Sequence, residues 1–250
     1  MAERTFHTPE PIELEVQIPV GDIEVETIDG DTTTIEVSGS EKLVEQVEIE
    51  QRGRTIVVAF RGKHHGIVLQ IGGFNIGGGE LRVRARVPHA SDAKLTTASA
   101  DMVVRGRVNR LETKSASGDL VVVGDIAGEA RLKTVSGDVV LGGVAEGLSV
   151  QSVSGDVRAD TVGGDVEAKT VSGDVRVVAQ RGTTTVQSVS GDIEIGVAAG
   201  TNLDVDAGSV SGDLTSEVPL GSDTGSLADG PTLVVRGKTV SGDFRVFRAA

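Results

Sequence analysis

Apolar and polar residues alternate along the first ninety residues in the manner of amphipathic β-strands. Apolar side chains occupy every second position in residues 12–18 and again in 23–26, with Pro-Val-Gly-Asp between the two runs. A turn at 29–31 precedes a third run, and the same pattern predicts strands at 44–50, 55–60 and 81–87. The pattern therefore predicts an all-β region over residues 1–90, which would cap the rest of the chain.

The pattern changes near residue 97, where a six-residue motif begins that occurs eight times. Its consensus is Ser or Thr, a small apolar residue, Ser, Gly, Asp and an apolar residue, and its Asp residues follow one another at steps of 18, 19, 18, 18, 18, 21 and 30. A repeat of about 18 residues cannot enclose its own core, so it must stack on its neighbours. Residues 91–250 are therefore predicted to form a parallel β-solenoid, similar to a single-stranded β-helix, with a loop at 216–231 inserted before the last coil.

Each coil is predicted to contain two short strands and two turns. In residues 157–174 the apolar alternation holds for both strands and then slips at Val171, which indicates a corner. Stacking then aligns equivalent residues into two apolar columns. One contains Val135, Val153, Val171, Val189, Val210 and Val240, and the other contains Met102, Leu120, Val139, Val157, Val175, Ile193, Leu214 and Phe244. Phe244 and Phe247 are expected to cap one end.

The Gly-Asp pair at each corner is predicted to be a structural turn motif. Glycine adopts positive φ without strain, and aspartate accepts hydrogen bonds from turn backbone. The pairs are Gly118-Asp119, Gly137-Asp138, Gly155-Asp156, Gly173-Asp174, Gly191-Asp192, Gly212-Asp213 and Gly242-Asp243.

The motif has two chemical alternatives to a structural turn, a calcium site and a catalytic site. Calcium-binding β-rolls need aspartate in every nine-residue turn, but only Asp156, Asp165 and Asp174 keep that step here. Acid–base catalysis needs carboxylates in different environments, whereas these occupy equivalent positions, and all four His residues lie outside the repeats. We therefore expect no calcium site, no cofactor and no enzymatic activity.

Composition narrows the possible partners. The net charge is −13, and the chain has five Phe but no Trp, Tyr or Cys. An acidic surface without aromatic platforms argues against nucleic acid binding. No apolar run reaches the length of a membrane span or resembles a signal peptide, so an integral membrane segment is not expected. A cytoplasmic location is expected, with the cell surface as the alternative.

Two segments outside the repeats carry further expectations. Arg82, Arg84 and Arg86 alternate with apolar residues and are predicted to pair with acidic residues on neighbouring strands. The glycine-rich segment 66–79 is either a cap over the first coil or an apolar loop offered to a partner or a membrane surface. Its candidate contact residues are Ile67, Leu69, Ile71, Phe74 and Ile76.

The Val-Ser-Gly-Asp-Val units that follow an alternating β region resemble the bacterial β-strand-repeat family of "putative adhesins", also called toast-rack-like domains. The resemblance covers roughly residues 10–248. It implies a β-solenoid and, in some members, a link to envelope stress responses; it implies no catalytic residues. Two functional classes follow. One is a non-enzymatic scaffold or interaction module that binds a protein partner, or associates with itself, through the solenoid ends. The other is an exported, adhesin-like surface protein.

Overall fold

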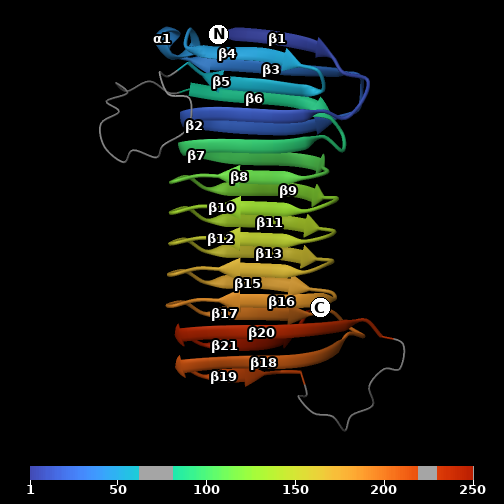
Figure 1. The fold of residues 1–250 in the computed structure, drawn as a ribbon, viewed down its shortest axis with the longest axis vertical. Coiled ribbons are helices and arrows are strands. Elements are labelled where there is room, and N and C mark those ends of the chain that lie inside the picture. The colour runs from blue at the N-terminus through green and yellow to red at the C-terminus, as the bar shows by residue number, and fades with distance from the viewer. Residues whose placement is uncertain (62–80, 219–229, 250) are drawn as a thin grey trace.

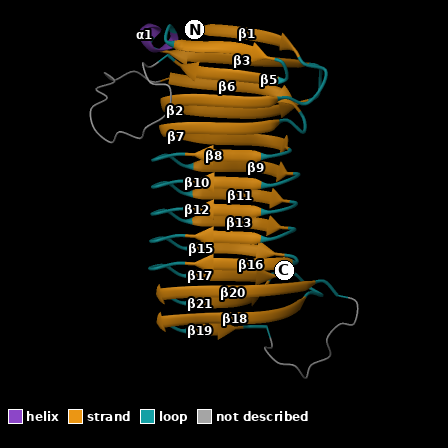
Figure 2. Ribbon diagram, viewed as in Figure 1, coloured by secondary structure: helices purple, strands orange, loops and turns teal. Residues whose placement is uncertain are grey.

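The computed structural model describes residues 1–61, 81–218 and 230–249, and over these residues the chain is an elongated stack of β-strands with one short helix (Figures 1 and 2). The middle of the stack consists of flattened coils, each with one strand on either face. Strands of neighbouring coils are parallel and in register, as in the pairing of Val157 with Val175. The predicted parallel β-solenoid with coils of about 18 residues is confirmed.

The regular coils extend from β8 to β17 and define two faces. Face A contains β8 (Leu111–Lys114), β10 (Ala130–Lys133), β12 (Leu148–Gln151), β14 (Val166–Lys169) and β16 (Gly182–Gln187). Face B contains β9 (Leu120–Ile126), β11 (Val139–Val144), β13 (Val157–Val162), β15 (Val175–Ala179) and β17 (Ile193–Val197). Side chains alternate between interior and solvent along each strand, so the two sheets enclose a narrow core of small aliphatic side chains.

Parallel stacking continues into the first ninety residues. The long strands β2 (Glu13–Ile28) and β7 (Asp92–Val108) each supply both faces of a coil and pair along most of their length. β5 (Thr55–Phe60) and β6 (Leu81–Pro88) lie on the other side of β2 and pair with its two halves. The chain thus leaves β2, builds the coil outside it, and crosses back over it to β7.

Antiparallel strands close this end. β3 (Thr32–Gly39) pairs with β6, β1 (Ala2–His7) pairs with β3, and β4 (Val47–Arg52) pairs with β5. The single turn of helix α1 (Glu41–Val44) buries Leu43 and Val44 against the stack. The expected strand at 44–50 therefore starts later, because Val44 belongs to this helix. The N-terminal end of the core is covered.

The arginine pairing expected on strand β6 is confirmed. Arg82 contacts Asp22 at 3.0 Å, Arg84 contacts Glu24 at 2.9 Å, and Arg86 lies 3.5 Å from Glu26 and 3.6 Å from Glu36. Glu24 is also 3.4 Å from Arg105 on β7, so its carboxylate connects β6, β2 and β7. The hydrogen bond from Arg84 is the main cause that lowers the pKa of Glu24 below its ordinary value of 4.5.

The order of coils at the C-terminal end differs from the order in the sequence. The last strands, β20 (Thr232–Ser241) and β21 (Phe244–Arg248), lie between β16–β17 and the outermost coil, which contains β18 (Asn202–Ser211) and β19 (Leu214–Ser216). The expectation that Phe244 and Phe247 cap the end is therefore wrong. Phe244 is almost fully buried in the second-to-last coil, and the ring of Phe247 lies 4.6 Å from the Arg176 guanidinium.

The narrow core accommodates the large side chain of Phe244 because the residue opposite it is small. Phe244 takes the place that Ile193 and Val175 occupy in the preceding coils. Opposite it, on face A of the same coil, the chain has Gly237, where the previous coil has Val186. A β-carbon on Gly237 would lie 2.0 Å from Cε2 of Phe244, so glycine provides the room that the ring fills.

Candidate functional site

The Ser-Gly-Asp turns lie together along one edge of the solenoid, where face A passes into face B; we call this the turn edge. Gly118, Gly137, Gly155, Gly173 and Gly191 have φ between +111° and +135°, Gly242 has +135° and Gly212 has +154°. A β-carbon on Gly173 would lie 2.3 Å from the carbonyl oxygen of Gly155. Each turn therefore packs directly against the backbone of the turn before it, and two separate constraints favour glycine.

The aspartates form a ladder along the same edge. The backbone N–H of Asp174 donates to Oδ1 of Asp156 at 2.8 Å, and that of Asp156 donates to Oδ1 of Asp138 at 2.9 Å. The same bond links every step of the column, in the stacking order Asp101, Asp119, Asp138, Asp156, Asp174, Asp192, Asp243 and Asp213. Each carboxylate thus binds the backbone of the next coil rather than its own turn, and couples neighbouring coils.

A stripe of exposed valines runs beside this ladder; we call Val135, Val153, Val171, Val189, Val240 and Val210, in stacking order, the valine stripe. Five of them are 44–49% exposed, and Val210 in the outermost coil is 82% exposed. The first column read from the sequence therefore does stack, but on the outer surface of the molecule. The sequence held a signal for this: if Leu132 on β10 and Thr134 just after its end point inward, continued alternation directs Val135 outward.

A column of lysine and glutamine flanks the valine stripe on face A, and all of its members are exposed: Lys114, Lys133, Gln151, Lys169, Gln187 and Lys238. A groove of about 660 Å³ lies between this column and the stripe, over β14, β16, β20 and β18. The surface of the turn edge thus changes from basic, through apolar, to acidic within a single coil.

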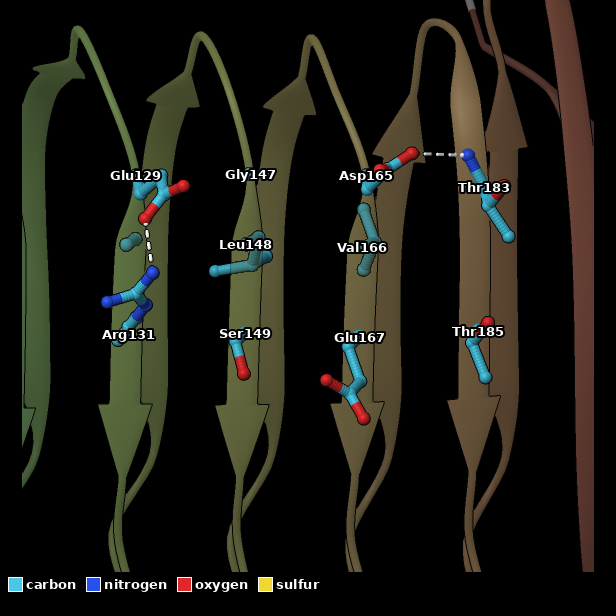
Figure 3. Close-up of a pocket in the computed structure, with 11 residues that line it drawn as sticks. Glu129, Arg131, Gly147, Leu148, Ser149, Asp165, Val166, Glu167, Thr183 and Thr185 are labelled. Atoms are coloured by element: carbon cyan, nitrogen blue, oxygen red, sulfur yellow. Dashed lines mark hydrogen bonds and ion pairs between the residues drawn. The ribbon is translucent and has the colours of Figure 1, made fainter.

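A second, shallow groove of about 460 Å³ crosses β10, β12, β14 and β16 on face A, near the opposite edge (Figure 3). Its acidic side chains are already engaged. Glu129 pairs with Arg131 at 2.6 Å, Asp165 accepts from the Thr183 N–H at 2.8 Å, and Glu167 pairs with Lys169 at 2.6 Å. The Asp165 contact links two neighbouring coils, whereas each glutamate pairs with a residue two positions further along its own chain segment. These contacts do not set two carboxylates against a common substrate position.

The C-terminal end of the solenoid is open over the described residues. There, β18 pairs only with β20, and β19 pairs only with β21. Leu203 and Val205 on β18 are in register with Leu233 and Val235, which are fully buried, yet both are only partly buried themselves. Leu214 on β19 is 52% exposed. This coil presents strand edges and core side chains that another strand would cover.

The remaining sequence expectations fall outside these surfaces. The segment 66–79, with its candidate residues Ile67, Leu69, Ile71, Phe74 and Ile76, and the pair His64 and His65 lie outside the described residues. Within the described ranges, no group of three or more His, Asp or Glu side chains is arranged to hold a metal ion. Within the same ranges, no helix has the length and apolar character of a membrane span.

The geometry defines a parallel β-solenoid with one closed end, one open end and a patterned turn edge. The family model "Toastrack DUF4097" matches residues 12–247, so the chain belongs to this family. No curated protein sequence is similar enough to match the chain.

Two solved structures share the fold. A "putative adhesin" from Bacteroides fragilis is 13% identical, with a TM-score of 0.56 over 98% of this chain and 96% of its own. A "putative adhesin" from Parabacteroides merdae is 14% identical, with a TM-score of 0.54 over 97% of this chain and 95% of its own. At these identities the likeness is one of fold.

Proposed function

We propose that this protein is a non-catalytic binding module that takes a protein strand at its open C-terminal coil. The observation that carries the proposal is the outer edge of the ten-residue strand β18, which has no strand partner other than β20 among the described residues and whose Leu203 and Val205 are only partly buried. An added strand would satisfy backbone groups and cover these side chains at the same time, which is the physical basis of β-augmentation. At the N-terminal end, β1 and β4 also have a single strand partner each among the described residues, but each is only six residues long.

The orientation of the β18 backbone provides a sharp test. The N–H of Asn202 donates to the Pro231 carbonyl at 2.8 Å, so alternation directs the N–H of Ala207 away from β20, toward the open edge. Ala207→Pro should therefore block strand addition without removing a bond of the β18–β20 ladder. Ala207→Val keeps the N–H and is the matched control.

The assay is capture of proteins from the native cell by the immobilised full chain, with each variant compared at equal stability. We expect specific partners to be captured by the parent and Ala207→Val proteins, and to be lost with Ala207→Pro. Equal capture by all three proteins would contradict binding through this edge. The link to envelope stress implied by the family resemblance gains support if the captured partners belong to that response.

A second candidate function is an adhesin-like role at the cell surface. It is favoured by the two solved structures of the same fold, each of which is described as a "putative adhesin". Fractionation of the native, full-length protein separates the two proposals. Recovery with cytoplasmic proteins supports the intracellular module that we favour, and recovery at the surface supports the adhesin.

A further inference from the structure

The turn edge carries an acidic column and a basic column in which several charged groups form no ion pair among the described residues. The carboxylates from Asp119 to Asp243 accept a backbone hydrogen bond from the next coil but form no ion pair there, although stacking places them at spacings of about 4.8 Å. On the other side of the valine stripe, Lys133 and Lys238 also form no ion pair within the described ranges, whereas Lys114 and Lys169 pair with Glu112 and Glu167. The edge thus has an acidic border and a basic border, with apolar side chains between them.

We infer that the turn edge binds a second copy of this chain, with the two solenoids side by side and parallel. The occupant follows from the order of the columns across the edge. A two-fold axis that runs along the valine stripe, parallel to the stacking direction, reverses this order in the partner. It therefore sets the lysine–glutamine column of each copy opposite the aspartate column of the other, and the two valine stripes against each other.

The alternative symmetry fails on charge. A two-fold axis across the edge, perpendicular to the stack, gives antiparallel solenoids and sets lysine against lysine and aspartate against aspartate. Like charges in direct opposition are unfavourable. The coil spacing is the same in either direction, so both arrangements match the repeat and the charge pattern decides between them.

The valine stripe suits this contact because it is flat and regular. Its side chains have few rotamers, so little conformational entropy is lost when they pack. The stripe is only one residue wide, which places the interface at the small end of specific contacts, below about 1,200 Å² in total. The dimer is therefore expected to be concentration-dependent and to weaken as salt is added.

The absence of cysteine from the chain allows a direct test by disulfide cross-linking. Val153→Cys and Val189→Cys are made separately and oxidised as full-length proteins at about 1 mM, the weak end of specific association. Both positions lie on the proposed two-fold axis, so each variant should cross-link to itself. Glu146→Cys, at an exposed position on the opposite edge, is the control and should remain monomeric.

Charge reversal gives an independent measurement. Lys133→Glu replaces one attraction with a repulsion at two symmetric places, so the dissociation constant from sedimentation should rise roughly three- to tenfold at low salt. Arg131→Glu makes the same charge change two residues further from the edge and is the matched control. It should leave the dissociation constant within about twofold.

Several outcomes would overturn the inference. A monomer at about 1 mM would do so, as would equal cross-linking of the Glu146→Cys control. Cross-links that form only when Val153→Cys is mixed with Val240→Cys, which two fully overlapping antiparallel stripes would place opposite each other, would indicate the antiparallel pair. A dimer that persists with Lys133→Glu and is lost with Ala207→Pro would instead indicate end-to-end pairing through β18, and so would support the strand-addition surface.

Discussion

The contact between successive glycine turns makes a strong prediction about stability, and Gly173 is the position at which to test it. Its φ is +122°, where an alanine is strained by about 1–3 kcal/mol. The added β-carbon would also lie 2.3 Å from the carbonyl oxygen of Gly155 and 2.8 Å from its carbonyl carbon. Neither atom can move without displacing a coil, so a further 1–3 kcal/mol of overpacking is expected, roughly. Gly173→Ala should thus lower the free energy of unfolding by about 2–6 kcal/mol.

Gly30 separates the two contributions. Its φ of +136° is similarly strained for alanine, but a β-carbon there would meet no atom within 4 Å. Gly30→Ala should therefore show the strain alone, about 1–3 kcal/mol. The difference between the two variants measures the packing of one turn on the next.

Urea unfolding followed by far-ultraviolet circular dichroism is the appropriate assay, because the chain has no Trp or Tyr for fluorescence. With a slope of about 2–3 kcal/mol/M, the two transition midpoints should differ by about 0.3–1.5 M. Equal midpoints for Gly173→Ala and Gly30→Ala would refute the close approach of the turns. An unchanged midpoint for both would also refute the backbone strain.

The other predictions concern the ladder, the core and ions. Asp156→Ala leaves the Asp174 N–H without its acceptor and should destabilise by about 1 kcal/mol in a urea melt, whereas Asp156→Asn keeps an acceptor and should be near neutral. Thr184 is fully buried, and its hydroxyl has no hydrogen-bond partner among the described residues, so Thr184→Val should raise the midpoint by the equivalent of about 1 kcal/mol. Because the folded-state pKa of Glu24 is lowered, its contribution is complete above pH 4.5 and is lost as the pH falls through that pKa; Glu24→Gln should flatten the decline of stability in acid titrations. Thermal melts with chelator and with millimolar Ca²⁺ should agree within a few degrees, and a large rise with Ca²⁺ would contradict our expectation.

Much of the solenoid could be predicted because its repeat fixes the register. Once equivalent residues are aligned at the 18-residue step, Val157 must lie beside Val175, and the alternation along each strand assigns the core. The arginine pairs of β6 were predictable for the same reason, since acidic and basic residues alternate in phase on neighbouring strands. Local rules and stacking agree throughout these coils.

The valine stripe shows where hydrophobicity misleads. Val171 looks like a core residue by composition, and it recurs in every coil like one. Only the parity of β14 at Ala168, continued past the end of the strand through Thr170, places it outside. A recurrent apolar residue at an exposed corner contributes little to the core of one molecule, and this is why we connect the stripe with a second molecule.

The order of the coils could not be predicted from the repeat. Any coil edge can pair with any other, because parallel ladders use backbone groups that every coil presents alike. The step of 30 residues before Asp243 indicated an insertion. It did not indicate that the last coil in the chain would lie between the two coils that precede it. The presence of Gly237 and Phe244 in the last coil is explained only by the structure, in which the two residues face each other across the core.

At both ends of the solenoid, the order of coils in the stack differs from their order in the chain. In each case, one coil lies between two coils that are not its neighbours on both sides in the sequence. β2 lies between β5–β6 and β7, and β20–β21 lie between β16–β17 and β18–β19. At the C-terminal end, β18 has no other strand partner among the described residues, so it can stack only after residues 232–241 have entered the gap. That pairing joins β16 to β20 across 51 residues, a large loop-closure cost compared with the 18-residue steps of the central coils. The outermost coil therefore depends on the last part of the chain to fold, and it is the coil whose edge is left available for a partner.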